Sequence, residues 1–399
     1  MDSSNGWTTF TVASGGTMTI GGAAQKGATF SGAQTWQKQG AGVLHVTGVM
    51  QDLGNIRFDS GGGAVTISGT VLGTGAASIM SNNSAAQSTV NLTGNGKFAI
   101  GGQLAINNNN MHLDWNMDGN SELSATNLYL GWNSASNEVL NFNQSGGTVT
   151  LNGAGTGFLN VMNNNTNATT TAAYNLNGGV LGLKQAIVGT GGALKLNGGT
   201  VKLLEGGVEL FKKGTVGGKV IVSAGGAIID TNGLVAVADA VNALPLEHDV
   251  TLSGKDGGLK VIGGGALLLS KVNTYDGGTV IENAILSVGA DATLGSGDVV
   301  VGNNSTLYLF NNAAIDSGAT LSFGSGVDIT LGYNGTLTLA GLYDQTANHW
   351  FDEGEYLSAN LSAYGFSGLG SLTVIPEPST WLLMITGAGL LTVTRRRRG

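Results

Sequence analysis

Short alternating apolar segments, each ended by a turn-forming residue, recur along most of this 399-residue chain. Four examples are 65–69 (VTISG), 90–94 (VNLTG), 149–153 (VTLNG) and 194–198 (LKLNG). Alternation of apolar and polar residues over a few positions is typical of a half-buried β-strand. Glycine and asparagine tolerate the left-handed backbone conformations of sharp turns. We therefore predict an all-β fold made of many short strands joined by tight corners.

The composition favours a folded chain over a disordered one. The chain has 69 glycines and only 11% charged residues, but 41% of its residues are hydrophobic. That hydrophobic fraction is large enough to form a core, which disordered low-complexity chains lack. The chain contains no cysteine, so the prediction includes neither a disulfide nor a thiolate nucleophile or ligand.

Longer repeats are visible behind the short ones. Segment 141–149 (NFNQSGGTV) is echoed first by 174–180 (YNLNGGV) and then by 196–201 (LNGGTV). Self-similarity at such intervals predicts a solenoid, in which each unit buries its apolar face only by stacking on its neighbours. We expect about 20–25 residues per coil, about 15–18 coils and a strand spacing of ~4.8 Å.

One stretch has a sharper pattern, at about 257–301. It runs from 258–270 (GLKVIGGGALLLS) through 273–280 (NTYDGGTV) to 284–288 (AILSV) and 294–297 (LGSG). It resembles the passenger-associated repeat of bacterial autotransporters, and the resemblance implies the rungs of a right-handed parallel β-helix. We extend this fold to a body of residues 1–372, and we expect 343–374 to close the stack.

The C-terminal tail, residues 373–399, has three parts in a fixed order. Two of the three prolines of the chain flank an acid in Pro376-Glu377-Pro378, and an apolar segment, 379–394, separates this motif from four arginines, 395–398. The apolar residues expected to anchor the segment in a membrane are Trp381, Leu382, Leu383, Met384, Ile385, Leu390, Leu391 and Val393. The terminal cations are Arg395, Arg396, Arg397 and Arg398.

The physical chemistry of these parts suits a membrane anchor. Proline fixes φ and biases the preceding residue to extended backbone, so the Pro-Glu-Pro motif is expected to be rigid and extended. The 16 residues of 379–394 would span roughly 24 Å as a helix, slightly less than a ~30 Å hydrocarbon core. One arginine at the bilayer centre costs about 2.5–3.5 kcal/mol on insertion scales, so the four arginines are expected to stop transfer.

The motif, the apolar span and the arginine cluster together resemble the PEP-CTERM sorting signal of Gram-negative bacteria. The resemblance implies that an exosortase is a partner and processes the tail. It also implies transient anchoring in the inner membrane, followed by a place at the cell surface or outside the cell. Proteins with this signal normally carry a secretory leader, but residues 1–7 (MDSSNGW) show neither its basic nor its apolar region. We therefore expect the start to be truncated, processed or misassigned.

Few residues suggest catalysis. The four histidines, His45, His112, His248 and His349, are scattered, and neither a Gly-x-Ser-x-Gly elbow nor a His-Glu-x-x-His zinc motif occurs. We therefore predict no catalytic residues, no metal site and no cofactor. Without the four terminal arginines, 13 basic residues face 25 acidic ones, so nucleic acid is not an expected partner.

The segment 114–122 (DWNMDGNSE) allows two interpretations. Asp114, Asn116 and Asp118 match the first half of an EF-hand calcium loop, but Ala125 takes the place of its final glutamate. Alternation offers the other interpretation: Met111, Leu113, Trp115 and Met117 face inward, whereas His112, Asp114, Asn116 and Asp118 form a solvated outer face. We expect the outer face, with calcium binding as the alternative.

These features predict an exported, non-enzymatic, structural or adhesin-like protein of the cell surface or of the extracellular or biofilm matrix. Extracellular polysaccharide is a further expected partner. The alternative is a carbohydrate-active β-helix enzyme, a lyase or hydrolase, which would require clustered carboxylates or basic residues beside a groove. A self-translocating autotransporter would need a C-terminal barrel, for which the 25 residues after Val374 are too few.

Overall fold

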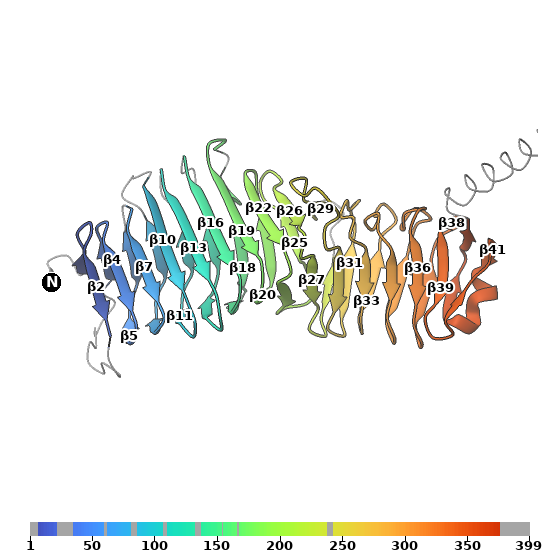
Figure 1. The fold of residues 1–399 in the computed structure, drawn as a ribbon, viewed down its shortest axis with the longest axis horizontal. Helices are drawn as coiled ribbons and strands as arrows, with labels where there is room; N and C mark the ends of the chain where they lie inside the picture. The colour runs from blue at the N-terminus through green and yellow to red at the C-terminus, as the bar shows by residue number, and fades with distance from the viewer. Residues whose placement is uncertain are drawn as a thin grey trace, which may run out of the picture.

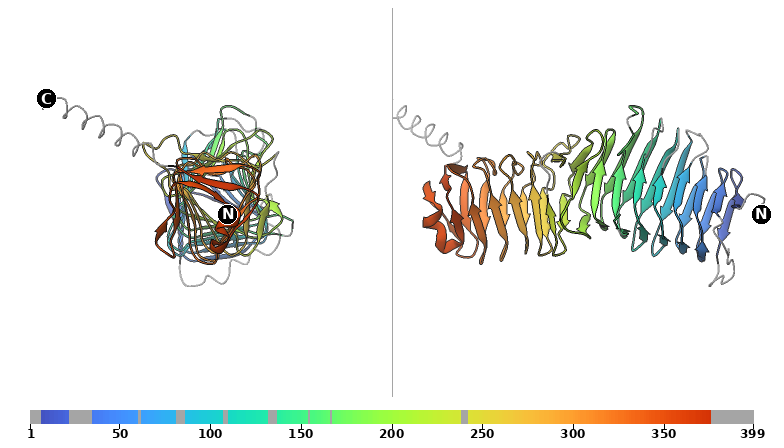
Figure 2. Two further views of the ribbon diagram at one scale, coloured as in Figure 1. Left: turned by 90° about the vertical axis from the view of Figure 1, so that its right-hand side faces the viewer. Right: turned by 180° about the vertical axis from the view of Figure 1, so that it is seen from behind.

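The chain forms an elongated stack of β-strand coils (Figure 1). The computed structural model describes residues 7–21, 35–59, 62–80, 86–106, 110–131, 137–153, 155–165, 167–237 and 242–375. Viewed along its axis, the stack forms a closed outline around a common interior (Figure 2). Nearly every strand pairs in parallel with a strand one coil earlier and one coil later, which confirms the predicted all-β solenoid architecture.

The first two sheets run along the N-terminal part of the stack, and all their strand pairs are parallel. The first sheet consists of β1 (Trp7–Thr11), β3 (Thr35–Gln39), β6 (Ile56–Asp59), β9 (Ala77–Met80), β12 (Leu104–Ile106), β15 (Leu128–Leu130), β18 (Phe158–Val161), β21 (Gln185–Val188) and β25 (Phe211–Lys213). The second sheet consists of β2 (Thr17–Ile20), β4 (Val43–Val46), β7 (Ala64–Ile67), β10 (Gln87–Leu92), β13 (His112–Met117), β16 (Val139–Gln144), β19 (Thr171–Leu176), β22 (Gly192–Leu196), β26 (Lys219–Val222) and β29 (Leu246–His248).

The third sheet is the longest, with 14 strands, and it joins the two parts of the stack. It consists of β5 (Val49–Leu53), β8 (Thr70–Gly73), β11 (Lys97–Ile100), β14 (Glu122–Ala125), β17 (Thr148–Leu151), β20 (Val180–Leu183), β23 (Thr200–Leu203), β27 (Ala227–Asp230), β30 (Leu259–Ile262), β32 (Thr279–Ile281), β34 (Val299–Val301), β36 (Thr320–Phe323), β39 (Gly341–Asp344) and β40 (His349–Trp350). Only the terminal pair, β39 with β40, is antiparallel.

The cross-section of the stack changes near residues 210–250. The first sheet ends at β25 and the second at β29, while a fourth sheet begins and continues beside the third to the C-terminal end. This fourth sheet consists of β24 (Val208–Glu209), β28 (Val235–Val237), β31 (Ala266–Leu269), β33 (Ile285–Val288), β35 (Thr306–Leu309), β37 (Asp328–Leu331) and β42 (Phe366–Gly368). The C-terminal coils are narrower than the coils that carry β13, β16 and β19 (Figure 1).

Strand register confirms the repeats seen in the sequence. Phe142 in β16 pairs with Tyr174 in β19, and Leu176 in β19 pairs with Leu196 in β22. The coil from Phe142 to Tyr174 is longer than the coil length expected from the sequence, whereas the coil from Leu176 to Leu196 lies at the lower end of that range. The stretch with the sharper pattern also has short coils, since Leu259 pairs there with Thr279. Coils of different length stay in register because each strand hydrogen-bonds to the one before it.

A continuous apolar core fills the interior, as the alternation predicts. In β13 every second side chain is buried, and the same pattern recurs in β16 and β19. Aromatic rings follow one another through the N-terminal coils, with neighbouring ring centroids 4.7–6.1 Å apart. The series runs through Phe10, Trp36, Phe58, Phe98, Trp115, Phe142 and Tyr174. Such contacts stabilise neighbouring coils beyond the burial of their area.

The C-terminal end is closed by a cap, as expected for 343–374. A three-stranded sheet joins β38 (Thr336–Leu339), β43 (Ser371–Val374) and β41 (Gly354–Leu357), and β41 runs antiparallel to β43. A 3-10 helix, η1 (Ser358–Tyr364), packs beside β42. Phe351 contacts the rings of Phe323 and Tyr364. Antiparallel strands and an aromatic cluster thus cover the last parallel coil, which reduces its open edge.

Candidate functional site

The residues assigned to the sorting tail lie outside the described part of the chain. The described residues end at Ile375, directly after β43, whereas the Pro-Glu-Pro motif, the anchor residues and the four arginines follow it. Within the described ranges no helix is long and apolar enough to cross a membrane. The tail therefore stays a prediction from the sequence.

The outer face of β13 has the polar composition that alternation predicts. Met111, Leu113, Trp115 and Met117 are at most 1% exposed, and the residues between them face outward. Two carboxylates of the segment that matches half of an EF-hand loop accept hydrogen bonds from other coils. Asp114 accepts one from Asn141 Nδ2 (2.9 Å), and Asp118 accepts one from the Gly94 backbone N–H (2.9 Å). Both carboxylates therefore cross-link neighbouring coils.

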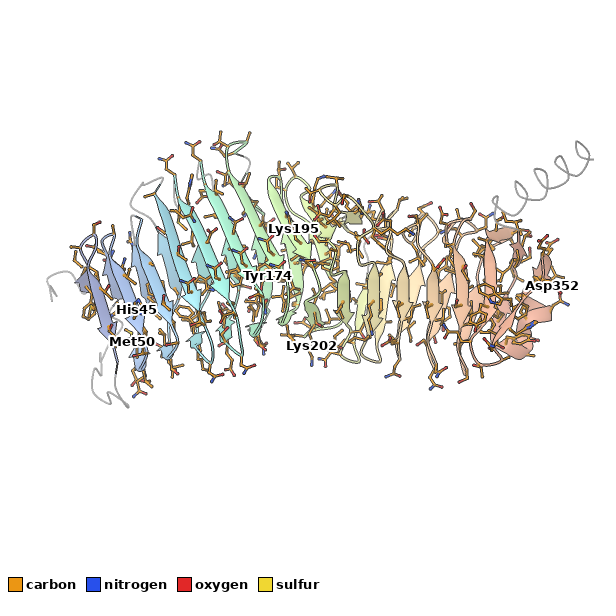
Figure 3. All side chains as sticks on the ribbon, viewed as in Figure 1. His45, Met50, Tyr174, Lys195, Lys202 and Asp352 are labelled. Atoms are coloured by element: carbon orange, nitrogen blue, oxygen red, sulfur yellow. The ribbon has the colours of Figure 1, made fainter. Side chains whose placement is uncertain are left out.

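Asparagine side chains form a ladder along the outer face of the second sheet. The Nδ2 of Asn116 donates to the Oδ1 of Asn91 (2.9 Å), Asn143 donates to Asn116 (3.0 Å), and Asn175 donates to Asn143 (2.8 Å). These residues occupy equivalent positions on successive strands, and Lys195 takes the same position on β22. Figure 3 labels Lys195 and, on the preceding strand, the inward-facing Tyr174.

Each amide of the ladder retains hydrogen-bonding capacity toward solvent. An asparagine side chain has two N–H donors and two lone pairs on its oxygen. The ladder uses one donor and one lone pair of Asn116 and of Asn143. The remaining groups make the ladder a row of uncharged donors and acceptors that repeats once per coil from Asn91 to Asn175.

A second polar cluster lies where the second sheet ends. His248 is the last residue of β29, Asp256 precedes β30, and Asp276 precedes β32 one coil further. His248 Nδ1 lies 3.0 Å from Asp256 Oδ2 and 3.2 Å from Asp276 Oδ1. Among the described residues, this is the one group of three His, Asp or Glu side chains whose potential ligand atoms all lie within 4.8 Å of one another.

Backbone hydrogen bonds hold the two carboxylates of this cluster. Asp256 Oδ1 accepts from the N–H groups of Gly258 and Gly277, both at 2.9 Å, and Asp256 Oδ2 accepts from the Asp276 N–H at 3.0 Å. In return, Asp276 Oδ1 accepts from the Asp256 N–H at 2.7 Å. The two aspartates therefore fix each other across neighbouring coils.

Glycines make the close approach of these coils possible. Gly258 (φ +71°) and Gly278 (φ +97°) have left-handed backbone conformations that other residues rarely adopt. A Cβ on Gly258 would collide with the backbone carbonyl of Gly278 on the next coil. The Asp-Gly-Gly sequences at 256–258 and 276–278 thus have a steric reason in addition to the hydrogen bonds of their aspartates.

The cluster concentrates negative charge around one imidazole. The Asp256 side chain is fully buried, whereas the side chains of His248 and Asp276 are 25% and 29% exposed. The hydrogen bond to Asp256, aided by the charges of both aspartates, raises the pKa of His248 above its ordinary value of 6.5. The arrangement therefore favours a positive charge at the imidazole nitrogen.

Sequence reasoning missed this cluster, although a signal for part of it was present. The segment around Pro245 marks a change in repeat style, and the two Asp-Gly-Gly sequences, 256–258 and 276–278, are separated by one coil. That separation indicates that the two aspartates stack. It does not indicate His248, because the irregular turn at 249–258 decides where the histidine lies.

Comparisons with protein-family models, with curated proteins and with solved structures find no match for this chain. Its function therefore has to be inferred from its own residues and geometry. The resemblances to a sorting tail and to a passenger-associated repeat stay predictions.

Proposed function

We propose that this chain is an exported, non-enzymatic structural protein of the cell surface or extracellular matrix, with an adhesin-like role. The observation that carries the proposal is the placement of the two ends of the rod. The first strands and the cap lie at opposite ends (Figure 1), and the cap strand β43 leads directly into the tail. A body anchored through this tail would project its N-terminal coils away from the membrane.

The architecture of the rod supports a role in holding its N-terminal coils at a distance from the membrane. In a solenoid each coil contacts only its neighbours, so adding coils extends the reach without changing the fold. The apolar core is continuous along the described coils, and the cap covers the end next to the tail. Such a rod resists bending because its backbone hydrogen bonds run along the axis.

The finer features of the fold belong to this proposal as well. We take the coil as right-handed, because parallel crossovers of this kind are right-handed in nearly all proteins. We take 379–394 as one membrane-spanning helix and 395–398 as its cytoplasmic stop. Exosortase processing then releases the body from the inner membrane to the surface.

The asparagine ladder supports extracellular polysaccharide as a partner. Neutral sugars are bound through hydrogen bonds from groups that carry no net charge, and the ladder offers amide donors and acceptors at each coil. Nucleic acid stays an unexpected partner because the body is acidic.

The sorting step is tested by the C-terminus of the mature protein. The chain is fused behind a secretory leader, it and its Glu377→Ala variant are expressed in a Gram-negative host with an exosortase, and the C-termini are determined by mass spectrometry. We expect a shortened C-terminus for the wild type and an intact, membrane-bound chain for the variant. Full-length wild-type protein in the cytosol would contradict the proposal.

The non-enzymatic role has its own test. The purified chain is incubated with a panel of neutral and acidic polysaccharides, and both binding and product formation are measured. Binding without turnover is expected. Clear turnover would favour the alternative of a lyase or hydrolase.

A further inference from the structure

The cluster of His248, Asp256 and Asp276 offers a mixed set of ligand atoms. One imidazole nitrogen and two carboxylate oxygens from different coils lie within 4.8 Å of one another. Calcium and magnesium are bound mainly by oxygen atoms, whereas imidazole favours zinc and the neighbouring transition metals. The chemistry of this set therefore selects a zinc-class divalent cation.

The distances fit such a cation. With zinc–ligand bonds of about 2.0–2.2 Å and tetrahedral angles, neighbouring ligand atoms lie ~3.4 Å apart. His248 Nδ1 lies 3.0 Å from the Asp256 oxygen and 3.2 Å from the Asp276 oxygen. An outward shift of a few tenths of an ångström opens the required space.

Each of the two carboxylate oxygens also has a lone pair to offer, and a bound cation would replace the proton that His248 Nδ1 otherwise donates to the aspartates. A carboxylate oxygen has about two acceptor positions. Asp256 Oδ2 accepts one backbone N–H, from Asp276, and Asp276 Oδ1 accepts one, from Asp256. One acceptor position on each oxygen therefore remains, and both oxygens lie within 3.2 Å of His248 Nδ1.

The ligands are held in place before any cation binds. Asp256 is buried and accepts backbone hydrogen bonds from Gly258 and Gly277 as well as from Asp276. Supporting hydrogen bonds of this kind orient the ligands of metal sites and increase affinity. The partial exposure of His248 and Asp276 leaves a path for the cation and a position for a water ligand.

We propose that His248, Asp256 and Asp276 bind one zinc-class cation, which ties the end of the second sheet to the first two narrow coils of the stack. The cation would neutralise two neighbouring carboxylates and link three segments at the point where the cross-section changes. The site would act as a clamp between the two parts of the rod. This role is independent of the sorting tail.

The test uses the full chain, purified in mild detergent and stripped of metal with a chelator. Zinc chloride, calcium chloride and magnesium chloride are titrated separately by calorimetry, and thermal unfolding is followed with and without each salt. We expect saturable binding of one zinc ion per chain with an increase in Tm, and no such effect of calcium or magnesium. Absence of saturable zinc binding would overturn the proposal.

Two variants separate metal binding from the hydrogen bonds of the cluster. In His248→Asn the amide N–H occupies the place of Nδ1, so it still donates to the carboxylates but no longer binds metal. In Asp276→Asn the carbonyl oxygen keeps its acceptor role without the charge. Both are expected to weaken zinc binding by more than about tenfold while circular dichroism stays unchanged.

The matched control is His112→Asn, because His112 lies on the outer face of β13, away from the cluster. It is expected to bind zinc like the wild type. Cobalt titration of the wild type gives a readout that needs no variant, since visible absorption of a four-coordinate cobalt(II) ion is expected. Unchanged zinc affinity in His248→Asn, or an equal loss in His112→Asn, would sink the assignment.

Discussion

Phe142 and Tyr174 stack face to face inside the rod, with ring centroids 4.7 Å apart and an angle of 9° between their planes. They occupy the same register position on neighbouring strands of the second sheet. Trp115, one coil earlier, stacks on the other side of Phe142 at 5.5 Å. Three successive coils therefore share one column of rings.

Truncation of the central ring is expected to weaken this column. Phe142→Ala removes contacts on both sides and leaves a cavity in a core where the ring is fully buried. We expect a loss of about 3–5 kcal/mol in the free energy of unfolding of these coils. Denaturant unfolding and hydrogen exchange measure it. The control Val250→Ala, at a side chain 85% exposed, should change stability by less than about 0.5 kcal/mol.

Alkaline pH is expected to destabilise the same column through Tyr174. Burial raises the pKa of its hydroxyl well above the ordinary value of 10.0. Above pH 10 the unfolded chain therefore releases a proton that the folded chain retains, and stability falls as the pH rises. The fall continues until the pH reaches the raised pKa of the folded state.

The measurement compares the wild type with Tyr174→Phe in unfolding experiments from pH 8 upward. The variant loses the 2.6 Å hydrogen bond that the hydroxyl donates to Gln144, so at neutral pH it should be less stable by about 1–3 kcal/mol. Above pH 10 the difference should shrink. Parallel curves for the two proteins would show that Tyr174 does not carry this effect.

The asparagine ladder makes a graded prediction. Asn143 both donates to Asn116 and accepts from Asn175, whereas Asn91 at the start only accepts from Asn116. At about 0.5–1.5 kcal/mol per hydrogen bond, Asn143→Ala should destabilise about twice as much as Asn91→Ala. Urea unfolding of both variants checks the ratio, and equal effects would mean that the ladder does not stabilise as a chain.

The contact between the coils at Gly258 and Gly278 allows a steric test. Gly233→Ala meets no atom within 4 Å and suffers only from its positive φ of 73°, which should cost about 1–2 kcal/mol. Gly258→Ala has a similar φ of 71° and also collides with the backbone of Gly278. Thermal unfolding should therefore show a clearly larger loss for Gly258→Ala. A loss equal to that of Gly233→Ala would indicate that the coils separate easily.

Much of the fold could be predicted from local patterns. The alternation in 111–117 predicts which side chains of β13 are buried, because adjacent residues of a strand point to opposite faces. The echo of 141–149 at 174–180 predicts the pairing of Phe142 with Tyr174, because equivalent residues of a solenoid stack in register. The cap at 343–374 is also visible, since the repeat rhythm stops there.

Other relationships depend on how the coils lie in space. The series of aromatic rings passes from Phe98 on the third sheet to Trp115 on the second. The spacing of the repeats does not encode this contact across the interior. The change of cross-section near β29 is also not encoded in the repeat spacing. There the first and second sheets end and the fourth sheet begins.

The candidate metal site shows most clearly which features follow from local sequence patterns and which depend on tertiary structure. By itself the sequence determined that the chain forms a solenoid of stacked coils, because its short repeats recur at intervals that fit such coils, and it places an Asp-Gly-Gly sequence at both 256–258 and 276–278. Only the tertiary structure decided that His248 joins them. An irregular turn returns the chain to the start of β30, and its path depends on packing against coils that are distant in sequence.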